Sequence, residues 1–545
     1  MAGAGPRLRR LSCVLAILVV NSVALACSSG GDDGGDGGDT TTVVGADAEA
    51  SPLGELLPLR AEGGDDPHFV DKSGREVLLR GVNVNSLGDY HQAEPDLSPT
   101  LPVTEADWRS MASLGFSAVR VIVSWSRLEP EPGEFDTDYV AEIHDAVDQA
   151  AASGIYVILD MHQDAWGPYI ATPADHDCPD GLERAIGWDG APEWATLTDG
   201  AETCRSPGSR ESAAAVKAAF QSFYDDRVPE GGEIGIRTAL ARTWGRLAGE
   251  FADQPAVAGY DLFNEPNGVE RLDVQLPKYT TFVNDAITAI RDAERRAGGF
   301  AHIVFVEPIV LYPLPKSVPA AGFNGDPNLA FAPHHYWESI TDVLTIEQGF
   351  GVTANASAAL GMPYWVGEYG WWSTDDGDLE ELRRYAAAED AAIVGGAWWQ
   401  WRQACGDPHS IGVPGNQPDD QIHLNGLGCP EGEDLGVTGS YATVLSRAYP
   451  RAAPGRITDL SSDPEARTAT IRGEAPEPVG ELMAWVPDGG HGEPDTEGAG
   501  LADIDLTKVD GGWILSAEVT CRSYSLTIDL PPESAGTTAH PEDRC

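Results

Sequence analysis

Positively charged side chains are scarce in this chain of 545 residues. Lysine and arginine together number 35, against 86 aspartates and glutamates, so the formal net charge is −51. A phosphate backbone or an anionic membrane surface would repel such a chain. We therefore expect no nucleic-acid partner, and the simplest interpretation of the acidity is a solvated surface that keeps an exported protein soluble.

The sequence also lacks the short spacings that hold metals, because neither CxxC nor HExxH occurs in it. We expect neither a metal nor another cofactor. Six of the eight cysteines follow residue 27 and fall in neighbouring pairs: Cys178 and Cys204, Cys405 and Cys429, Cys521 and Cys545. In an exported protein such pairs predict three disulfides, each worth about 3 kcal/mol in the chain-entropy model. Six cysteines nevertheless allow fifteen connectivities, so this pairing is a hypothesis.

The N-terminal apolar run is too short for a permanent membrane span. LSCVLAILVVNSVALA follows three arginines and precedes Cys27, which predicts an export signal over residues 1–26. ALAC at 24–27 resembles a bacterial lipoprotein signal, in which Cys27 would carry the lipid. Ala24 stands where such signals most often have leucine, so ordinary cleavage with Cys27 left free stays open. Residues 27–65, rich in Gly and Asp, predict a disordered tether for an exported protein that is anchored at the cell surface or released.

Between about 66 and 450, short apolar runs alternate with longer amphipathic stretches, a pattern typical of parallel strands joined by helices. The runs are 78–84, 118–123, 156–162, 259–266, 302–308, 329–336, 364–370 and 395–401. Eight strands predict an α/β fold, a closed (β/α)8 TIM barrel. Helices are expected after Thr104, which with Asp107 resembles an N-cap, and at 139–153, 237–251, 278–297 and 378–393. Residues 455–545 alternate in short segments and predict a small antiparallel β-sandwich, whose default role is to brace the barrel.

Polar and ionisable residues gather where these runs end, at the rim on which TIM barrels build active sites. They are Asn83, His162, Asn264, Glu265, Glu307, His334, Tyr336, Glu368 and Trp399. Glu265 alone could be a turn residue, but Glu368 ends the seventh run and would face it across the barrel mouth. Glycoside hydrolysis needs such a pair, because one carboxyl protonates the leaving oxygen while the other attacks the anomeric carbon. Direct attack predicts carboxyls about 5 to 5.5 Å apart and retention of configuration.

Six positions in the right strand order resemble glycoside hydrolase family 5, of the retaining clan A barrels. They are NEP at 264–266, the glutamate of WVGEYG, the arginine of AVRVIV, the histidine of DMHQD, HxY in PHHY, and a tryptophan in the eighth run. LRGVNVNS, SWSRLEPEPGEFD, GAPEWATLTDG and DMHQDAWG are similar to the endoglycoceramidases of that family, which cleave between a glycan and ceramide. The long segment 163–236, which holds GAPEWATLTDG, is expected to shape the binding site.

The resemblance implies a role for each matched residue. Glu265 would be the acid/base and Glu368 the nucleophile. Asn264 would hydrogen-bond the sugar 2-hydroxyl, and Tyr336 would orient Glu368 through its phenol. Arg120 would hold the nucleophile ionised, as a nearby guanidinium does.

A second group would bind the sugar beside the scissile bond. His162 and His334 would line this subsite, and Asp164 would bind sugar hydroxyls. Trp399 would form the platform under the ring, because an aromatic face suits axial C–H groups. Trp194 matches an aromatic of the family's long loop and would border the same site.

Some choices stay open at this point. Alternation favours His334 over His335 as the inward-facing residue, whereas Trp399 and Trp401 lie two apart and both could point inward. Glu307 places a third carboxylate at the rim, where it would bind sugar or raise the pKa of the acid/base. SLGDYHQAEP also lacks a lysine that some endoglycoceramidases carry, so the preferred glycan stays undetermined.

We expect a monomeric retaining endo-β-glycosidase acting on glycosphingolipids. One alternative is an endo-β-glucanase or β-glycosidase with simpler aglycones. Another is a catalytically silent surface protein that binds carbohydrate, although a binder gains nothing from two facing glutamates. An apolar groove leading away from the sugar pocket would favour the glycosphingolipid, and a long cleft with many aromatic platforms the glucan.

Overall fold

The computed structural model describes residues 55–91, 96–314, 317–319, 322–411, 423–477, 479–488, 490 and 492–530. The predicted signal and Cys27 therefore lie outside the described residues. Among the described residues, every helix is too short or too polar to cross a membrane.

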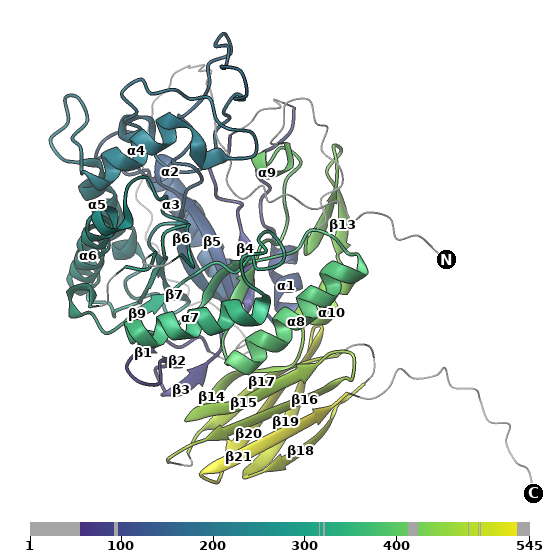
Figure 1. The fold of residues 1–545 in the computed structure, drawn as a ribbon. Helices are drawn as coiled ribbons and strands as arrows, with labels where there is room; N and C mark the ends of the chain where they lie inside the picture. The colour runs from purple at the N-terminus through teal and green to yellow at the C-terminus, as the bar shows by residue number, and fades with distance from the viewer. Residues whose placement is uncertain are drawn as a thin grey trace, which may run out of the picture.

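Eight parallel strands form the barrel that the alternating pattern predicts, with the predicted runs and the observed strands in one-to-one correspondence (Figure 1). They are β4 (Gly81–Val84), β5 (Ala118–Ser124), β6 (Tyr156–His162), β7 (Val257–Asp261), β8 (Ile303–Val306), β9 (Leu329–Phe331), β10 (Val366–Tyr369) and β11 (Gly396–Trp398). They pair in the order β10-β11-β4-β5-β6-β7-β8-β9. Phe331 bridges to Tyr364, and Trp365 N–H donates to the Phe331 carbonyl, which closes the barrel between β9 and β10.

Helices on the outside of the barrel follow most of the expected positions. Those observed are α1 (Glu105–Ser113), α2 (Trp125–Leu128), α3 (Thr137–Ala152), α4 (Ala214–Tyr224), α5 (Ile236–Glu250), α6 (Leu272–Ala297), α7 (Ile346–Leu360), α8 (Asp376–Ala392), α9 (Pro408–Ile411) and α10 (Gly439–Leu445). Thr104 caps α1 through a capping box with Asp107, as expected. Helix α6 starts six residues before the expected 278 and contains Pro277 at its sixth position, where proline lacks the N–H that would donate to the Asp273 carbonyl.

All but two of the remaining strands form a two-sheet sandwich, and its antiparallel pairing was predicted. One sheet contains β1 (Leu59–Glu62), β2 (His68–Asp71), β3 (Arg75–Val77), β14 (Tyr449–Pro454), β17 (Glu481–Pro487), β20 (Gly512–Val519) and β19 (Leu501–Val509). The other contains β15 (Arg456–Asp463), β16 (Thr468–Glu474), β21 (Ser523–Asp529) and β18 (Asp495–Ala499). A hairpin of β12 (Asn425–Gly428) and β13 (Glu433–Val437) stands apart from both.

The predicted domain boundaries were wrong at both ends of the barrel. Strand β1 lies inside the predicted tether, β2 and β3 lie inside the predicted barrel, and β14 precedes residue 455. The cause is a long-range pairing, in which Val77 of β3 lies opposite Ala452 of β14. A boundary placed by local composition misses such a pairing, because it joins segments more than 370 residues apart.

A buried ionic cluster joins the sandwich to the barrel. Arg80 Nη2 lies 2.6 Å from Asp390 Oδ1, and Arg447 Nε donates to the same oxygen at 2.9 Å. The backbone N–H of Ser462, in β15, donates to Asp390 Oδ2 at 2.9 Å. Figure 1 shows the sandwich at the end of the barrel opposite α4 and α9, which lie in the loops after β6 and β11. The sandwich thus packs far from the rim where the strands end.

Two of the three predicted disulfides are present. Cys178 pairs with Cys204 within the long segment after β6, and Cys405 pairs with Cys429. Cys521 is exposed and forms no disulfide within the described part of the chain. Its predicted partner, Cys545, lies outside that part, so the third pairing stays a prediction.

Candidate active site

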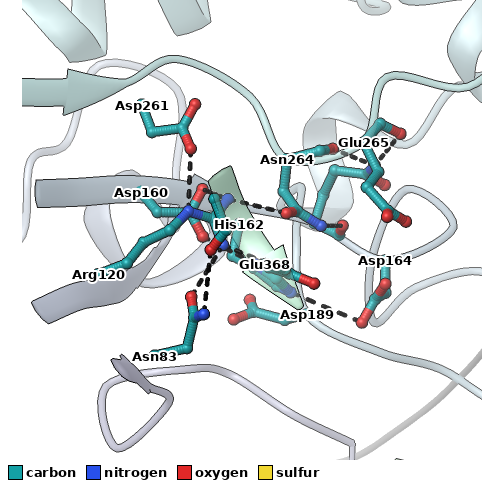
Figure 2. A network of polar contacts seen from close by, with 12 residues as sticks. Asn83, Arg120, Asp160, His162, Asp164, Asp189, Asp261, Asn264, Glu265 and Glu368 are labelled. Atoms are coloured by element: carbon teal, nitrogen blue, oxygen red, sulfur yellow. Dashed lines mark hydrogen bonds and ion pairs between the residues drawn. The ribbon is translucent and has the colours of Figure 1, made fainter. Parts of the chain in front are cut away.

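The predicted site residues come together around one buried arginine at the carboxyl ends of the strands. Arg120, on β5, is fully buried. Its guanidinium lies 2.9 Å from carboxylate oxygens of Asp261 and Glu368 and 3.0 Å from Asp160 (Figure 2). It also lies 2.9 Å from Glu307 Oε1. It also donates to the side-chain oxygens of Asn83, at 3.2 Å, and Asn264, at 2.9 Å. Burial opposes the charge of Arg120, but these carboxylates hold its pKa well above its ordinary value.

Glu368 ends β10 and has two firm partners. Arg120 Nη1 lies 2.9 Å from its Oε1, and the Tyr336 hydroxyl donates to its Oε2 at 2.7 Å. Burial, followed by the charge of Glu368, raises the pKa of Tyr336 well above its ordinary value, so the phenol stays a donor. Both contacts fix the direction in which this carboxylate points.

Glu265 follows β7 in a strained backbone conformation, with φ at +40°. A residue other than glycine rarely adopts such an angle, and observed cases cluster at functional sites. Its backbone N–H donates to Glu307 Oε2 at 2.8 Å, which holds the turn in place. The Glu265 side chain lines the cavity at the barrel mouth.

The carboxylates of Glu265 and Glu368 approach each other around His334. His334 Nδ1 lies 3.0 Å from Glu265 Oε1 and 3.4 Å from Glu368 Oε2. An oxygen of each carboxylate and a nitrogen of His334 all lie within 4.8 Å of one another. Such a close approach of two oxygens favours the retaining arrangement, because inverting enzymes keep their carboxyl groups about 6.5 to 9.5 Å apart to admit a water molecule.

The pKa values around this pair move in opposite directions. Burial raises the pKa of Glu265, but the hydrogen bond and charge of His334, and then the charge of Arg210, lower it below its ordinary value. Burial lowers the pKa of His334, but the charges of Glu307 and Glu368 raise it well above its ordinary value. A carboxylate at Glu265 and an imidazolium at His334 are therefore the favoured forms.

Glu307 lines the cavity and connects Arg120 to the backbone of Glu265. One of its oxygens accepts from Arg120 and the other from the Glu265 backbone. His334 Nε2 lies a further 3.3 Å from its Oε1. The net shift of the Glu265 pKa is downward, because the hydrogen bond and charge of His334 and then the charge of Arg210 outweigh burial, so a rise through Glu307 does not dominate.

A second wall of the site carries the remaining predicted sugar-binding residues. His162 ends β6, its Nδ1 is 2.7 Å from Asp160 Oδ2, and its Nε2 is 3.7 Å from Asp164 Oδ2. The ring of Trp399 stacks on His162 with centroids 5.6 Å apart and 16° between planes. Trp399 lines the cavity, whereas Trp401 is buried beneath and donates from Nε1 to Asp107 at 3.0 Å.

The histidine choice from alternation agrees with the structure. His334 lines the cavity, whereas His335 is buried behind it, where its Nε2 lies 2.8 Å from Thr353 Oγ1 and its ring packs on Phe350. Burial lowers the pKa of His335 to about 3, so it is neutral. Asn83 also lies behind the rim, where it donates to the carbonyl of Gly367 at 3.1 Å.

Trp194 does not line the cavity, contrary to the expectation that it borders the site. Its indole donates to the carbonyl of Glu129 at 2.9 Å, and its ring packs edge-on against Trp125 at 5.4 Å. Trp188, from the same long segment, lines the cavity instead. Both rings lie in one irregular segment, so no periodicity in the sequence separates them.

Sequence reasoning also missed Arg210, which comes from the 3-10 turn η2 (Arg210–Ser212) in the long segment. Its guanidinium reaches Glu265 Oε2 at 3.3 Å, pairs with Asp164, and lies 5.1 Å from the ring centroid of Trp188. His409, near the start of α9, contributes a ring 5.7 Å from Trp399. Neither residue ends a strand, and this is why a search of strand ends passes over them.

The whole arrangement encloses a cavity of about 630 Å³. Its lining combines the carboxylates, histidines and Arg210 of the site and the ring of Trp399 with apolar and aromatic side chains: Ile309, Val310, Tyr312, Trp337, Ile340 and Trp372. Trp372, 37% exposed, stacks on Tyr336 at 5.9 Å and 23° and so forms part of the cavity mouth.

Comparison with known proteins gives one consistent result. Residues 70–404 match the family model described as cellulase (glycosyl hydrolase family 5). Endoglycoceramidase I of Rhodococcus hoagii is 27% identical over 396 residues, which span 67% of this chain and 72% of that protein. Endoglycoceramidase of Cyanea nozakii is 28% identical over 36% of this chain, and this match spans only 40% of the relative's length.

Solved structures extend the likeness to most of the chain. A crystal structure of an endogalactoceramidase is 44% identical, with a TM-score of 0.78, and the match covers 87% of this chain and 100% of that one. The lactosyl-enzyme intermediate of endo-glycoceramidase II from Rhodococcus sp. is 26% identical, with a TM-score of 0.65, over 87% and 100% of the two chains.

Proposed function

The chain belongs to glycosyl hydrolase family 5, and from this premise we propose that it is a retaining endo-β-glycosidase that cleaves between the glycan and the ceramide of glycosphingolipids. The observation that carries the proposal is the carboxylate pair at the barrel mouth, with oxygens of Glu265 and Glu368 within 4.8 Å. Its substrate class is supported by the endogalactoceramidase structure, which is 44% identical over its whole length.

The site geometry supports a two-step reaction. In the first step Glu368 attacks the anomeric carbon while Glu265 gives a proton to the departing ceramide oxygen, which leaves a covalent glycosyl-enzyme. In the second step Glu265 takes a proton from water, and the water oxygen displaces Glu368 from the sugar. The hydrogen bond between His334 Nδ1 and Glu265 Oε1, at 3.0 Å, lets the pair hold the proton that the first step needs.

The roles of the surrounding residues follow from their contacts. Arg120 and Tyr336 orient the nucleophile, because each contacts a different oxygen of Glu368. Asn264 is held by Arg120 and by the Gln163 carbonyl, to which its Nδ2 donates at 3.1 Å, and its place beside Glu265 suits a contact with the sugar 2-hydroxyl.

The sugar binds at the polar groups of the cavity in this proposal. Trp399 offers its ring as the platform, and His162 and Asp164 bind hydroxyls beside it. The apolar side chains that line the same cavity, which include Ile309, Ile340 and Trp372, are chemically suited to alkyl chains. A cavity that combines polar groups with apolar side chains favours a lipid aglycone over a long glucan, which would need several aromatic platforms in a row.

Product analysis tests the proposal. Purified protein incubated with a glycosphingolipid in detergent micelles should release the intact oligosaccharide and ceramide, both seen by mass spectrometry. A panel that differs in the first sugar, glucose or galactose, should then reveal the preferred glycan. Release of monosaccharides alone, or hydrolysis of glucans but not of glycolipids, would contradict the proposed substrate.

Two substitutions test the proposed mechanism on the same substrates. Glu368→Gln should abolish turnover of every substrate, because the covalent intermediate can no longer form. Glu265→Gln should slow glycolipid cleavage by about 10²- to 10⁴-fold, the usual contribution of general acid catalysis. Formation of the intermediate from a dinitrophenyl glycoside should suffer far less, because that leaving group departs without a proton. Loss of both activities to the same degree in Glu265→Gln would contradict its role.

We further propose that the protein is exported, anchored through lipid on Cys27, and monomeric. Export and the anchor rest on the sequence of residues 1–27, which lie outside the described residues, and an anchor would hold a glycolipid hydrolase near a substrate that lies in a membrane. Detergent phase partitioning should place the wild-type protein in the detergent phase and Cys27→Ser in the aqueous phase. Light scattering of the protein without its lipid tests the monomer.

A further inference from the structure

Arg210 occupies a position that the two-step mechanism does not use. It comes from the long segment after β6, and its side chain is 19% exposed. Its three guanidinium nitrogens reach three different carboxylates. Nη1 pairs with Asp164, Nη2 lies 3.3 Å from Glu265 Oε2, and Nε lies 3.0 Å from Glu211 Oε1.

We propose that Arg210 is a positioning residue of this active site, which fixes both the orientation and the charge of Glu265 by bridging it to Asp164. The inference rests on the proposed function for the roles of Glu265 as acid and as base. The bridge itself is a property of the free protein.

The position of the guanidinium is set before any substrate arrives. Asp164 and Glu211 are both buried, and Glu211 Oε2 also accepts from Asn267 Nδ2 at 3.0 Å. Trp188 lies beneath the guanidinium at 5.1 Å. A planar guanidinium can serve three acceptors at fixed angles, which a lysine ammonium cannot do in the same geometry.

The segment that carries Arg210 is itself held in place. The disulfide between Cys178 and Cys204 lies six residues before it, and Arg205 is buried and pairs with Glu183 at 2.7 Å. Tyr224, at the end of α4, donates to the Asn267 carbonyl at 2.9 Å. The bridge thus connects a fixed loop to the catalytic carboxylate and does not rest on a mobile surface side chain.

Charged groups face Glu265 from every element around it. His334, after β9, and Arg210 are the positive groups. Glu307, after β8, and Glu368, on β10, are acidic, and Glu307 accepts from the Glu265 backbone. Asp164, after β6, raises the pKa of Glu265, against the lowering by His334 and Arg210. Glu211, beside Arg210, also interacts with Glu265, and burial is the main cause that raises its own pKa to about 8.

These contacts give Arg210 opposite effects on the two steps. It favours the carboxylate form of Glu265, which the second step needs as base. By lowering the pKa of Glu265, Arg210 also makes the acid form lose its proton at a lower pH. The rate of the first step, which needs that proton, therefore begins to fall at a lower pH. Loss of Arg210 should therefore move the alkaline limb of the pH profile of kcat/KM to higher pH, because removing a cation 3.3 Å away raises a carboxyl pKa.

The test compares Arg210→Met and Arg210→Lys with the wild type. Arg227→Met is the matched control, because Arg227 belongs to the same long segment but pairs with the exposed Asp199 and does not touch the site. Each protein is assayed across pH with methylumbelliferyl and dinitrophenyl β-lactosides, and thermal unfolding checks its fold.

With the methylumbelliferyl lactoside, we expect the alkaline limb of the kcat/KM profile of Arg210→Met to lie about one pH unit higher than that of the wild type. An adjacent opposite charge changes a carboxyl pKa by about one to three units. Its plateau should fall more for this substrate than for the dinitrophenyl lactoside, whose departure needs no acid. Arg210→Lys should return the alkaline limb most of the way to its wild-type pH but should not recover the plateau value of kcat/KM. Arg227→Met should match the wild type in the position of the limb and in the plateau.

Other results would overturn the proposal. An unmoved limb in a folded Arg210→Met would mean that Arg210 does not act on Glu265. Equal loss toward both leaving groups would assign Arg210 to substrate binding or folding. If Arg210→Met does not fold, the folded Arg210→Lys decides through its plateau, since an unchanged ratio between the two leaving groups would equally refute positioning.

Failure of the Arg210 proposal can be told apart from failure of the proposed function. A wild type that cleaves lactosides but no glycolipid would refute the substrate class and leave the Arg210 comparison intact. A wild type that cleaves neither would refute the glycosidase itself, together with the inference that depends on it.

Discussion

Removing the Tyr336 hydroxyl is the sharpest test of how the nucleophile is oriented. Tyr336→Phe deletes a single hydrogen bond, the 2.7 Å donation to Glu368 Oε2. It keeps the ring that stacks on Trp372 at 5.9 Å, so the wall of the cavity is preserved. Arg120 still holds the other oxygen of Glu368 at 2.9 Å.

The expected loss can be worked from this geometry. A hydrogen bond to a charged group is worth about 1.5 to 3 kcal/mol, which corresponds to roughly 10- to 150-fold in rate. Because Arg120 remains, we expect a fall in kcat/KM near the lower end, about 10- to 30-fold. The loss should be equal for glycosides with good and poor leaving groups, since Tyr336 acts on the nucleophile and not on the acid.

Steady-state kinetics on the two lactosides measures this effect. Tyr385→Phe is the matched control, because Tyr385 is buried outside the cavity and its hydroxyl has no hydrogen-bond partner among the described residues. The control should keep wild-type kcat/KM. An unchanged kcat/KM in a folded Tyr336→Phe, or a loss that depends on the leaving group, would refute the reasoning.

Three further predictions concern stability. Burial lowers the pKa of His162, but the charge and hydrogen bond of Asp160 raise it to about 10. The stability that its protonation contributes should therefore be complete below about pH 6.5 and be lost as the pH rises toward 10. In urea unfolding, the difference in unfolding free energy between pH 6 and pH 10 should be smaller for His162→Gln than for the wild type. Reducing the disulfide at Cys178, or replacing this cysteine by serine, should lower the free energy of unfolding by about 3 kcal/mol if the chain-entropy model holds, and an unchanged denaturation midpoint would contradict it. Asp390→Asn should lower the free energy of unfolding by about 3 to 5 kcal/mol, because it removes a buried carboxylate that pairs with Arg447. A loss below about 1 kcal/mol in that free energy would show that the cluster does not join sandwich and barrel.

Sequence reasoning succeeded where the pattern is local. Each barrel strand was visible as a short apolar run, because a strand buried on both faces needs consecutive apolar residues. Parallel strands in a closed barrel end at one rim, so the polar residues that follow them had to meet, and Glu265 and Glu368 do meet there. The alternation expected over the run 329–336 favoured His334 over His335, and the structure has His334 in the cavity and His335 behind it, although both follow β9, which ends at Phe331.

Sequence reasoning failed where a long irregular connection or a pairing between distant segments determines the position of a residue. Trp194 and Trp188 lie in the same irregular segment, and only packing turns one onto Trp125 and the other into the cavity. The domain boundaries failed for a related reason, since β3 pairs with β14 across almost the whole chain. No local composition records such a pairing.

By itself the sequence determined the barrel, the rim and the two carboxylates, because local periodicity fixes which residues end a strand and barrel closure brings those ends together. Only the tertiary structure decided the electrostatics of Glu265. His334 was within reach of sequence reasoning, but the direction of the Glu265 pKa also depends on Arg210, which a folded loop delivers from 55 residues away. Charges act through distance in space, and distance along the chain does not report it.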